Sequence, residues 1–301
     1  MADTAKGRRK RGNFKFFDNF NWYVPGVGQM FILLLMLLVG AVLGNLVTLA
    51  FTLAGGQEAA SDYAMLIAYP VMFIPAMMYA GARSKIASCS SAGVKLDSGH
   101  YGRTGGLICG LLVVAATLAS GFCLDISTAL LPEMPEQLEE MLKGMTTGVI
   151  WANFISVSIF APLFEEWLCR GMILRGLLHN RVRPVWAVLI SSAFFALIHL
   201  NPWQAVPAFA LGCLFGYVYY KTGSLKLTML MHFTNNTFSL ILSNMDSLKD
   251  MDSWMQVMPA TLYWIVFAAC ILLLVLIVRT FARIPLLSRE GNCDKVESLF
   301  G

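Results

Sequence analysis

The sequence predicts an all-α protein: a polytopic transmembrane helical bundle of about eight membrane helices, with both termini on the cytoplasmic side. Hydrophobic residues make up 57% of the 301 residues and charged residues only 13%, whereas soluble domains carry about 25% charged residues. The mean hydropathy is +0.65. Long apolar segments recur along the chain, and most charged residues lie between them. These three observations favour a membrane protein over a soluble one.

The predicted membrane helices are the apolar segments long enough, or nearly so, to cross a hydrocarbon core of about 30 Å. We expect them at 28–53, 62–82, 105–124, 147–169, 185–200, 205–220, 226–243 and 258–280. The first is longer than the roughly 7–15 apolar residues of a signal peptide, so we interpret it as an uncleaved helix. The dipeptide Asn201-Pro202 separates the fifth from the sixth, because proline lacks a backbone donor and restricts the residue before it.

The basic residues predict the orientation of these helices. With the N-terminus inside, every lysine and arginine except Lys143 and Lys249 falls in a cytoplasmic segment, as the positive-inside rule requires. Arg170 and Arg175 are counted there too, as residues that follow the fourth helix. The chain then divides into a basic cytoplasmic segment (1–26), a transmembrane domain (27–282) with its catalytic core at about 147–243, and a polar cytoplasmic tail (283–301).

The distribution of the remaining residues bears on partners and cofactors. The net charge of +4 comes from basic residues at the edges of apolar segments, which predicts contact with the lipid bilayer and no nucleic-acid partner. The seven cysteines show no CxxC and no metal-ligand spacing, so we interpret them as small packing residues and expect no metal or cofactor. The outer segment 132–145 carries apolar residues at helical spacing and predicts a short interfacial helix.

Two adjacent acids, Glu165 and Glu166, follow the uncharged stretch Thr147–Phe164. One charge near the centre of a bilayer costs roughly 2.5–3.5 kcal/mol on insertion scales. Two neighbouring carboxylates also repel each other. Packing alone does not favour such a pair, so the sequence predicts a functional site there.

Helical geometry separates the roles of these two acids. Glu166 and Arg170 are four residues apart and therefore share a helix face, where they can form an ion pair. Glu165 points elsewhere and has no neighbouring cation in the sequence, which suits a general base. The alternative interpretation is a structural ion-pair cluster that fixes the end of the fourth helix.

Further polar residues lie on the predicted fifth and seventh helices. Phe195 lies one turn before His199, where its ring could support the imidazole. His232 and Asn236 are again four residues apart, so both side chains could donate hydrogen bonds to a developing oxyanion. The alternative for this second pair is hydrogen bonding between helices, a common use of Asn and His in membranes. Together with a carboxylate base, these groups meet the requirements for attack of water on an amide.

Three short motifs thus follow one another on predicted membrane helices: Glu165-Glu166-x-x-x-Arg170, Phe195-x-x-x-His199 and His232-x-x-x-Asn236. Over about 147–243 they resemble the signature motifs of the CAAX protease and bacteriocin-processing (CPBP, or Abi) family of intramembrane glutamic endopeptidases. The resemblance implies peptide hydrolysis without a metal, in a cavity open to the cytosol.

Carried over by position, the resemblance also implies a role for each residue. Glu165 and His199 would activate the water, and His232 and Asn236 would bind the oxyanion. Glu166 and Arg170 would position the base or the substrate.

The function predicted from the sequence is therefore an intramembrane endopeptidase. Its substrate would be a membrane-associated or lipidated peptide or protein, and it would lie in the plasma membrane if the host is bacterial. One alternative is a metal-dependent membrane protease with Glu165, His199 and His232 as ligands, although the chain has no HExxH motif. Another is a non-catalytic bacteriocin-immunity or scaffold membrane protein. A proton-coupled transporter is a weaker option, since no paired inverted repeat is evident.

Overall fold

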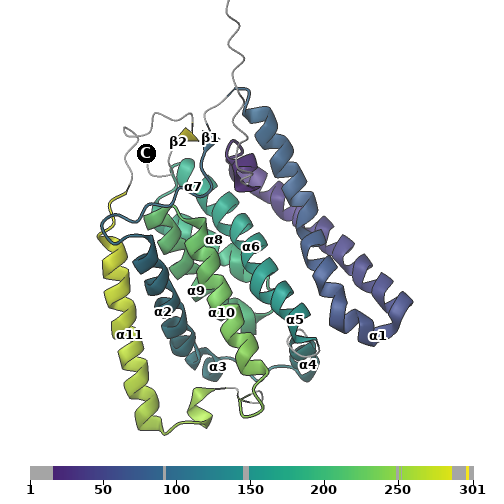
Figure 1. The fold of residues 1–301 in the computed structure, drawn as a ribbon, viewed down its shortest axis with the longest axis vertical. Helices are drawn as coiled ribbons and strands as arrows, with labels where there is room; N and C mark the ends of the chain where they lie inside the picture. Colours follow the sequence, from purple (N-terminus) through teal and green to yellow (C-terminus); the bar gives the residue numbers. More distant parts are fainter. Residues whose placement is uncertain are drawn as a thin grey trace, which may run out of the picture.

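A computed structural model describes residues 16–90, 93–144, 149–248, 251, 253–286 and 296–297. The basic residues 1–15 and most of the predicted tail lie outside this part of the chain. The described residues form a helical assembly, which confirms the predicted all-helical membrane class (Figure 1). Its elements are η1 (Phe16–Phe20), α1 (Val27–Ala87), β1 (Gly93–Val94), α2 (Gly106–Leu124), α3 (Ile126–Leu130), α4 (Glu136–Gly144), α5 (Ile150–Asn153), η2 (Phe154–Phe160), α6 (Ala161–Glu166), η3 (Trp167–Leu174), α7 (Arg175–His179), α8 (Pro184–Leu197), α9 (Pro202–Thr222), α10 (Leu225–Ser243), η4 (Trp254–Gln256), α11 (Ala260–Ala282) and β2 (Val296–Glu297).

Four helical stretches in the described part of the chain are long and apolar enough to cross a membrane. They are Val27–Gln57, Asp62–Ala87, Gly106–Leu124 and Ala260–Ala282, which correspond to the first three predicted spans and the last. The apolar helix α8 is shorter. The total of eight spans and the N-in/C-in orientation therefore remain predictions.

The helix break expected at Asn201-Pro202 is present, since α8 ends at Leu197 and α9 begins at Pro202. The side chain of Asn201 caps α9 by accepting a hydrogen bond of 2.9 Å from the backbone N–H of Gln204. The helix expected in the outer segment is present as α4.

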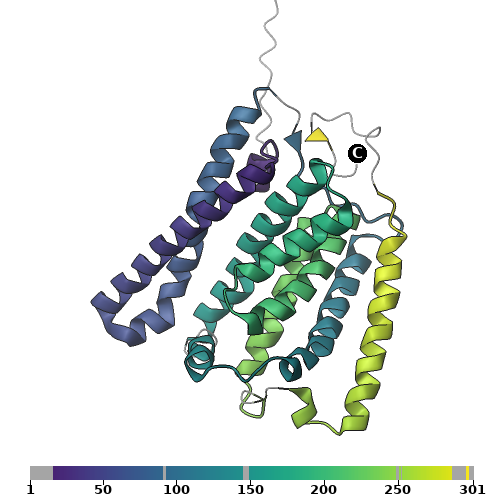
Figure 2. The ribbon, with the colours of Figure 1, turned by 180° about the vertical axis from the view of Figure 1, so that it is seen from behind.

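The long element α1 is a helical hairpin, seen at one side of the bundle in Figures 1 and 2. It reverses at Gly56, whose φ of +80° suits glycine. The two arms approach closely at glycines of the first arm. A Cβ on Gly40 would lie 1.8 Å from the backbone oxygen of Met72, and one on Gly44 would lie 3.1 Å from that of Ala68. The absent side chains let the arms pack backbone to backbone, as small residues do between membrane helices.

We therefore expect Gly40→Ala to lower the free energy of unfolding by about 1–3 kcal/mol, because the added methyl forces the two arms apart. Thermal or denaturant unfolding in detergent micelles measures the change. Gly28→Ala is the matched control, since no atom lies within 4 Å of a Cβ there and alanine is a better helix former. Equal stability of the two variants would contradict the close packing of the arms.

One continuous helical run extends from α5 to α7 and carries the two acids. It is not a regular α-helix, because the π-helical segments η2 and η3 lie on either side of the short α6. At the end of η2 the N–H of Ala161 donates to Ser156, five residues back. Pro162 has no N–H, so the carbonyl of Val157 loses its usual donors within the helix. Departures from α-helical to π-helical hydrogen bonding within a helix are frequent at functional sites.

The helical run continues beyond residue 169, the predicted end of the fourth span, to His179. Arg170 and Arg175, which were counted from the sequence among the residues after the fourth span, lie within this run and are fully buried. The guanidinium of Arg175 donates to the carbonyl oxygens of Val94 at 2.6 Å, Tyr23 at 2.5 Å and Phe20 at 3.3 Å. This arginine attaches the segments before and after α1 to the helical run, which its several rigid donors allow.

The α1 hairpin and α11 lie on opposite sides of the bundle in both views (Figures 1 and 2). The hairpin packs against α5, η2 and α6, whereas α11 packs against α2. A first apolar cluster joins the hairpin to η3, with Phe73 and Trp167 among its buried residues. A second joins α2, α9, α10 and α11 around Phe215. The two clusters hold the acid-bearing run between the hairpin and α8–α10.

Candidate functional site

The centre of the site is a fully buried ion pair within the helical run. Glu166 and Arg170 are both 0% exposed, and the Oε1 atom of Glu166 accepts a hydrogen bond of 2.7 Å from the Nη1 of Arg170. The Nη2 of Arg170 donates to the backbone oxygen of Gly212 on α9 at 2.9 Å. A Cβ on Gly212 would lie 3.3 Å from this nitrogen. Ser192 on α8 would lie nearer still, at 3.1 Å, so the glycine lets both α8 and the guanidinium approach α9 closely.

The ring of Phe195 joins the three motif segments. The Cζ atom of Arg170 lies 4.7 Å from the centre of this ring, within the range of a cation–π contact. The imidazoles of His199 and His232 meet the same ring edge to face, with centroids 5.1 and 5.4 Å away. Residues from η3, α8 and α10 are thus brought together around one buried phenylalanine.

His232 is 4% exposed and extends the ion pair into a three-residue network. Its Nδ1 lies 3.1 Å from the Oε1 of Glu166. An ionised carboxylate can only accept, so Nδ1 carries the proton and donates. The Nε2 of His232 can then donate a second hydrogen bond only when the ring is doubly protonated.

His199 lies in the turn that ends α8. Its backbone N–H donates to Ala196, three residues back, so the carbonyl of Phe195 is left without its usual donor. The Nδ1 of the imidazole fills that place at 2.8 Å, as side chains near a helix C-terminus often do. A carbonyl oxygen only accepts, so Nδ1 carries the proton. In the neutral ring, Nε2 therefore keeps a lone pair that can accept a proton or a hydrogen bond.

Asn236 is half-buried on α10. It provides a hydrogen-bond donor for a backbone carbonyl that has none within the π-helical segment. Its Nδ2 donates at 2.8 Å to the oxygen of Val157, the carbonyl that Pro162 leaves without a helical donor. Its Oδ1 accepts a hydrogen bond of 3.1 Å from Asn235. Among the described residues, one amide hydrogen of Asn236 is used in this way, which leaves the second for a ligand.

Glu165 faces the α1 hairpin instead of the ion-pair network. Its Oε1 accepts a hydrogen bond from the hydroxyl of Tyr69. Its Oε2 is buried and has no hydrogen-bond partner among the described residues. The two acids therefore lie in different surroundings, one bonded to an arginine and the other to a phenol.

Some of the candidate residues do not meet directly. Within the described part of the chain, no hydrogen bond joins Glu165 to His199. Nor do three His, Cys, Asp or Glu side chains of that part gather closely enough to hold a metal ion. A water molecule or a substrate would have to lie between Glu165 and the histidines for these groups to act together.

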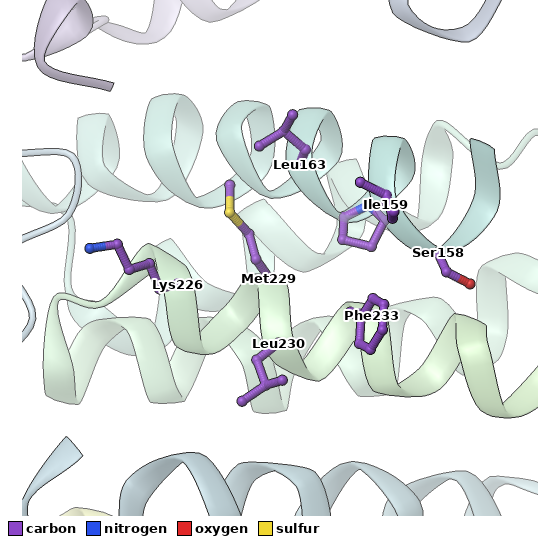
Figure 3. A pocket seen from close by; sticks show the side chains of 8 residues that line it. Ser158, Ile159, Leu163, Lys226, Met229, Leu230 and Phe233 are labelled. Atoms are coloured by element: carbon purple, nitrogen blue, oxygen red, sulfur yellow. The ribbon is translucent and has the colours of Figure 1, made fainter. Parts of the chain in front are cut away.

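An open, shallow apolar pocket of about 310 Å³ lies between the run η2–α6 and helix α10 (Figure 3). Its lining consists of Ser158, Ile159, Pro162, Leu163, Lys226, Met229, Leu230 and Phe233. None of the seven candidate residues lines it, but the two helices on its sides carry the first and third motifs. Lys226 lies at one end and pairs with Asp97 at 2.9 Å.

The sequence missed three partners of the site: Tyr69, the carbonyl of Gly212 and the carbonyl of Val157. The tyrosine is 96 residues from Glu165 and lies in an apolar helix, where one hydroxyl gives little signal. The two carbonyls belong to the backbone and leave no trace in side-chain patterns. Pro162 was the one available sign, since a proline inside a helix always frees a carbonyl.

Comparison with known proteins confirms the resemblance seen in the motifs. Residues 147–238 match the model of the Rce1-like family, described as Type II CAAX prenyl endopeptidase Rce1-like. All seven candidate residues fall in this segment. The family match and the apolar helices identify an integral membrane protein.

Two relatives match part of the chain. The membrane-embedded CAAX protease MroQ of Staphylococcus aureus (strain USA300) is 34% identical over 102 residues, which are 31% of this chain and 40% of that protein. The putative membrane peptidase YdiL of Bacillus subtilis (strain 168) is 31% identical over 85 residues, 28% of this chain and 34% of that protein. Less than half of either relative is thus matched. No solved structure matches the chain significantly.

Proposed function

We propose that this protein is an intramembrane endopeptidase that hydrolyses a peptide bond of a membrane-associated or lipidated peptide or protein. The observation that carries the proposal is the joining of the three motifs, because Phe195 contacts both histidines and Glu166 bonds both Arg170 and His232. The match of this segment to a family of membrane peptidases supports it.

The environment of Glu165 suits a general base. Tyr69 occupies one carboxylate oxygen, and the other is buried without a partner among the described residues. A water molecule that donates to Oε2 would lose its proton there as its oxygen attacks the carbonyl carbon. The Nε2 of His199 would accept the second hydrogen of that water and orient it. Glu165 would then pass the proton to the leaving amine nitrogen.

The oxyanion of the tetrahedral intermediate needs donors on the opposite side of the carbonyl carbon. The second amide hydrogen of Asn236 is one candidate. His232 is the other, on the condition that it is doubly protonated, because its Nδ1 already donates to Glu166. The buried ion pair would then hold His232 and Phe195 in place without touching the substrate.

The open apolar pocket between η2–α6 and α10 supports a membrane-associated substrate (Figure 3). It would accept apolar side chains or a lipid chain that enters sideways from the bilayer. A metal-dependent mechanism is less favoured, because Glu165, His199 and His232 do not gather within the described residues. No observation favours a scaffold that retains the fold without the chemistry.

Quantitative proteomics of host membranes tests the proposal. Membranes that contain the wild-type protein are compared with membranes that contain the double variant Glu165→Gln/His199→Ala. We expect at least one membrane peptide to accumulate uncut with the variant. Glu133→Gln, an acid-to-amide change in an exposed loop, is the control and should match the wild type. Identical peptide patterns for all three proteins would support the scaffold alternative. Cleavage that chelators stop and zinc restores would support the metal alternative.

A further inference from the structure

We propose that Tyr69, on the α1 hairpin, is the positioning residue that holds Glu165 in its reactive orientation. The inference rests on the proposed function, since it assigns a partner to the base of that reaction. Neither the motifs nor the family match includes Tyr69, which lies well before the matched segment 147–238.

The hydroxyl of Tyr69 donates to the Oε1 of Glu165, and both side chains are half-buried. No other hydrogen bond to the Glu165 carboxylate is made by the described residues. The hydroxyl of Tyr69 therefore determines which carboxylate oxygen of Glu165 accepts a hydrogen bond and which one is left for a water molecule. A free carboxylate on a long side chain samples several rotamers, whereas a hydrogen bond to a charged acceptor selects one.

The tyrosine itself is held by a row of aromatic rings. Its ring centre lies 5.7 Å from that of Phe73, one turn later on the same helix arm. Phe73 is 1% exposed and stacks at 5.2 Å on Phe164, the residue directly before Glu165. The hairpin therefore contacts the base twice, through a ring on the neighbouring residue and through a hydroxyl on the carboxylate.

This double contact gives the hairpin a function besides spanning the membrane. The aromatic stack fixes the distance between the hairpin arm and α6. At that distance, the hydroxyl of Tyr69 holds the carboxylate of Glu165 in one orientation. Loss of the hydroxyl alone would leave the stack and the fold in place. The free oxygen of Glu165 would then no longer be directed at the water.

The variant Tyr69→Phe removes only this hydroxyl and tests the inference. We expect kcat to fall by about 10- to 100-fold with KM changed less than twofold, the effect of losing one hydrogen bond to a charged group at the reacting centre. Tyr63→Phe is the matched control on the same helix arm. Tyr63 is 38% exposed and packs beside Trp151, away from Glu165, so its kcat should equal that of the wild type.

A second measurement separates a positioning role from a structural one. The infrared carboxylate band that disappears in Glu165→Gln is expected to shift in Tyr69→Phe and to stay unchanged in Tyr63→Phe, while the melting temperatures of both phenylalanine variants stay close to that of the wild type. If Tyr69→Phe does not accumulate in the membrane, Tyr69→Met takes its place.

The outcomes for the two proposals can be distinguished. Wild-type kcat and an unshifted band in Tyr69→Phe, together with an inactive Glu165→Gln, would overturn the role of Tyr69 and leave the endopeptidase proposal intact. An active Glu165→Gln would overturn the endopeptidase mechanism, and a shifted band would still show that Tyr69 orients this carboxylate.

Discussion

Replacing Glu165 with glutamine is expected to lower kcat by about 10²–10⁴-fold, the usual contribution of a general base, while the protein remains folded in the membrane. The amide has nearly the shape of the carboxylate and can still accept the hydrogen bond from Tyr69. It cannot take a proton from water, however. The loss should therefore appear in kcat, measured with a cleavable membrane peptide found by proteomics, and substrate affinity should change little.

The neighbouring acid provides the sharpest contrast to this variant. Glu166→Gln is the same chemical change one residue later, but it acts on a carboxylate that bonds Arg170 and His232. We expect it to lower stability as well as activity, whereas Glu165→Gln should keep the melting temperature of the wild type. If Glu165→Gln cleaved at the wild-type rate, the carboxylate would have no role as a base and the mechanism would be wrong.

The parts of the site that follow helical spacing could be predicted from the sequence. The pair Glu166–Arg170 and the contact of Phe195 with His199 both join residues four apart, and the structure shows both. The helix break before Pro202 could likewise be predicted from the sequence, because a proline restricts its own backbone and that of the preceding residue. Spacing rules of this kind depend only on the local helix.

Other features depend on contacts that the local sequence does not encode. Asn236 bonds the carbonyl of Val157 because the helix changes register there, and apolar periodicity does not distinguish a π-turn from an α-turn. Arg175 was counted in the cytoplasmic segment after the fourth helix, where an arginine normally reaches water. Its burial depends on carbonyls from residues 20, 23 and 94, which are far away in the chain.

The depth of the helices was equally hard to predict. Counting residues from the predicted ends of their spans, at a rise of 1.5 Å per residue, places His199 and His232 at depths in the membrane that differ by roughly 13 Å. The structure instead sets both rings against Phe195. Residue counts give the depth of a side chain only if the helices begin at the same membrane depth and run parallel. The local sequence determines neither the starting depth nor the tilt of a helix.

The variant Arg170→Met is expected to lower the free energy of unfolding by about 3–5 kcal/mol, the usual cost of leaving a buried charge without its partner. Glu166 is 0% exposed and would lose its guanidinium donor. The backbone oxygen of Gly212 would lose its partner too, and Phe195 its cation. Thermal or denaturant unfolding in micelles measures the loss, which Arg170→Lys should only partly prevent, because an ammonium lacks the planar fork that reaches both acceptors.

The double variant Glu166→Gln/Arg170→Met shows whether charge is the cause. It removes both members of the pair, so no uncompensated ion remains, and replacing both partners of a buried pair is often close to neutral. We expect it to be more stable than Arg170→Met alone, although the contacts of Arg170 with Gly212 and Phe195 are absent from both variants. If the double variant were as unstable as the single one, the packing and hydrogen bonds of the guanidinium would account for the loss. The ion pair would then have no stabilising role of its own, and Glu166 would be retained for its bond to His232.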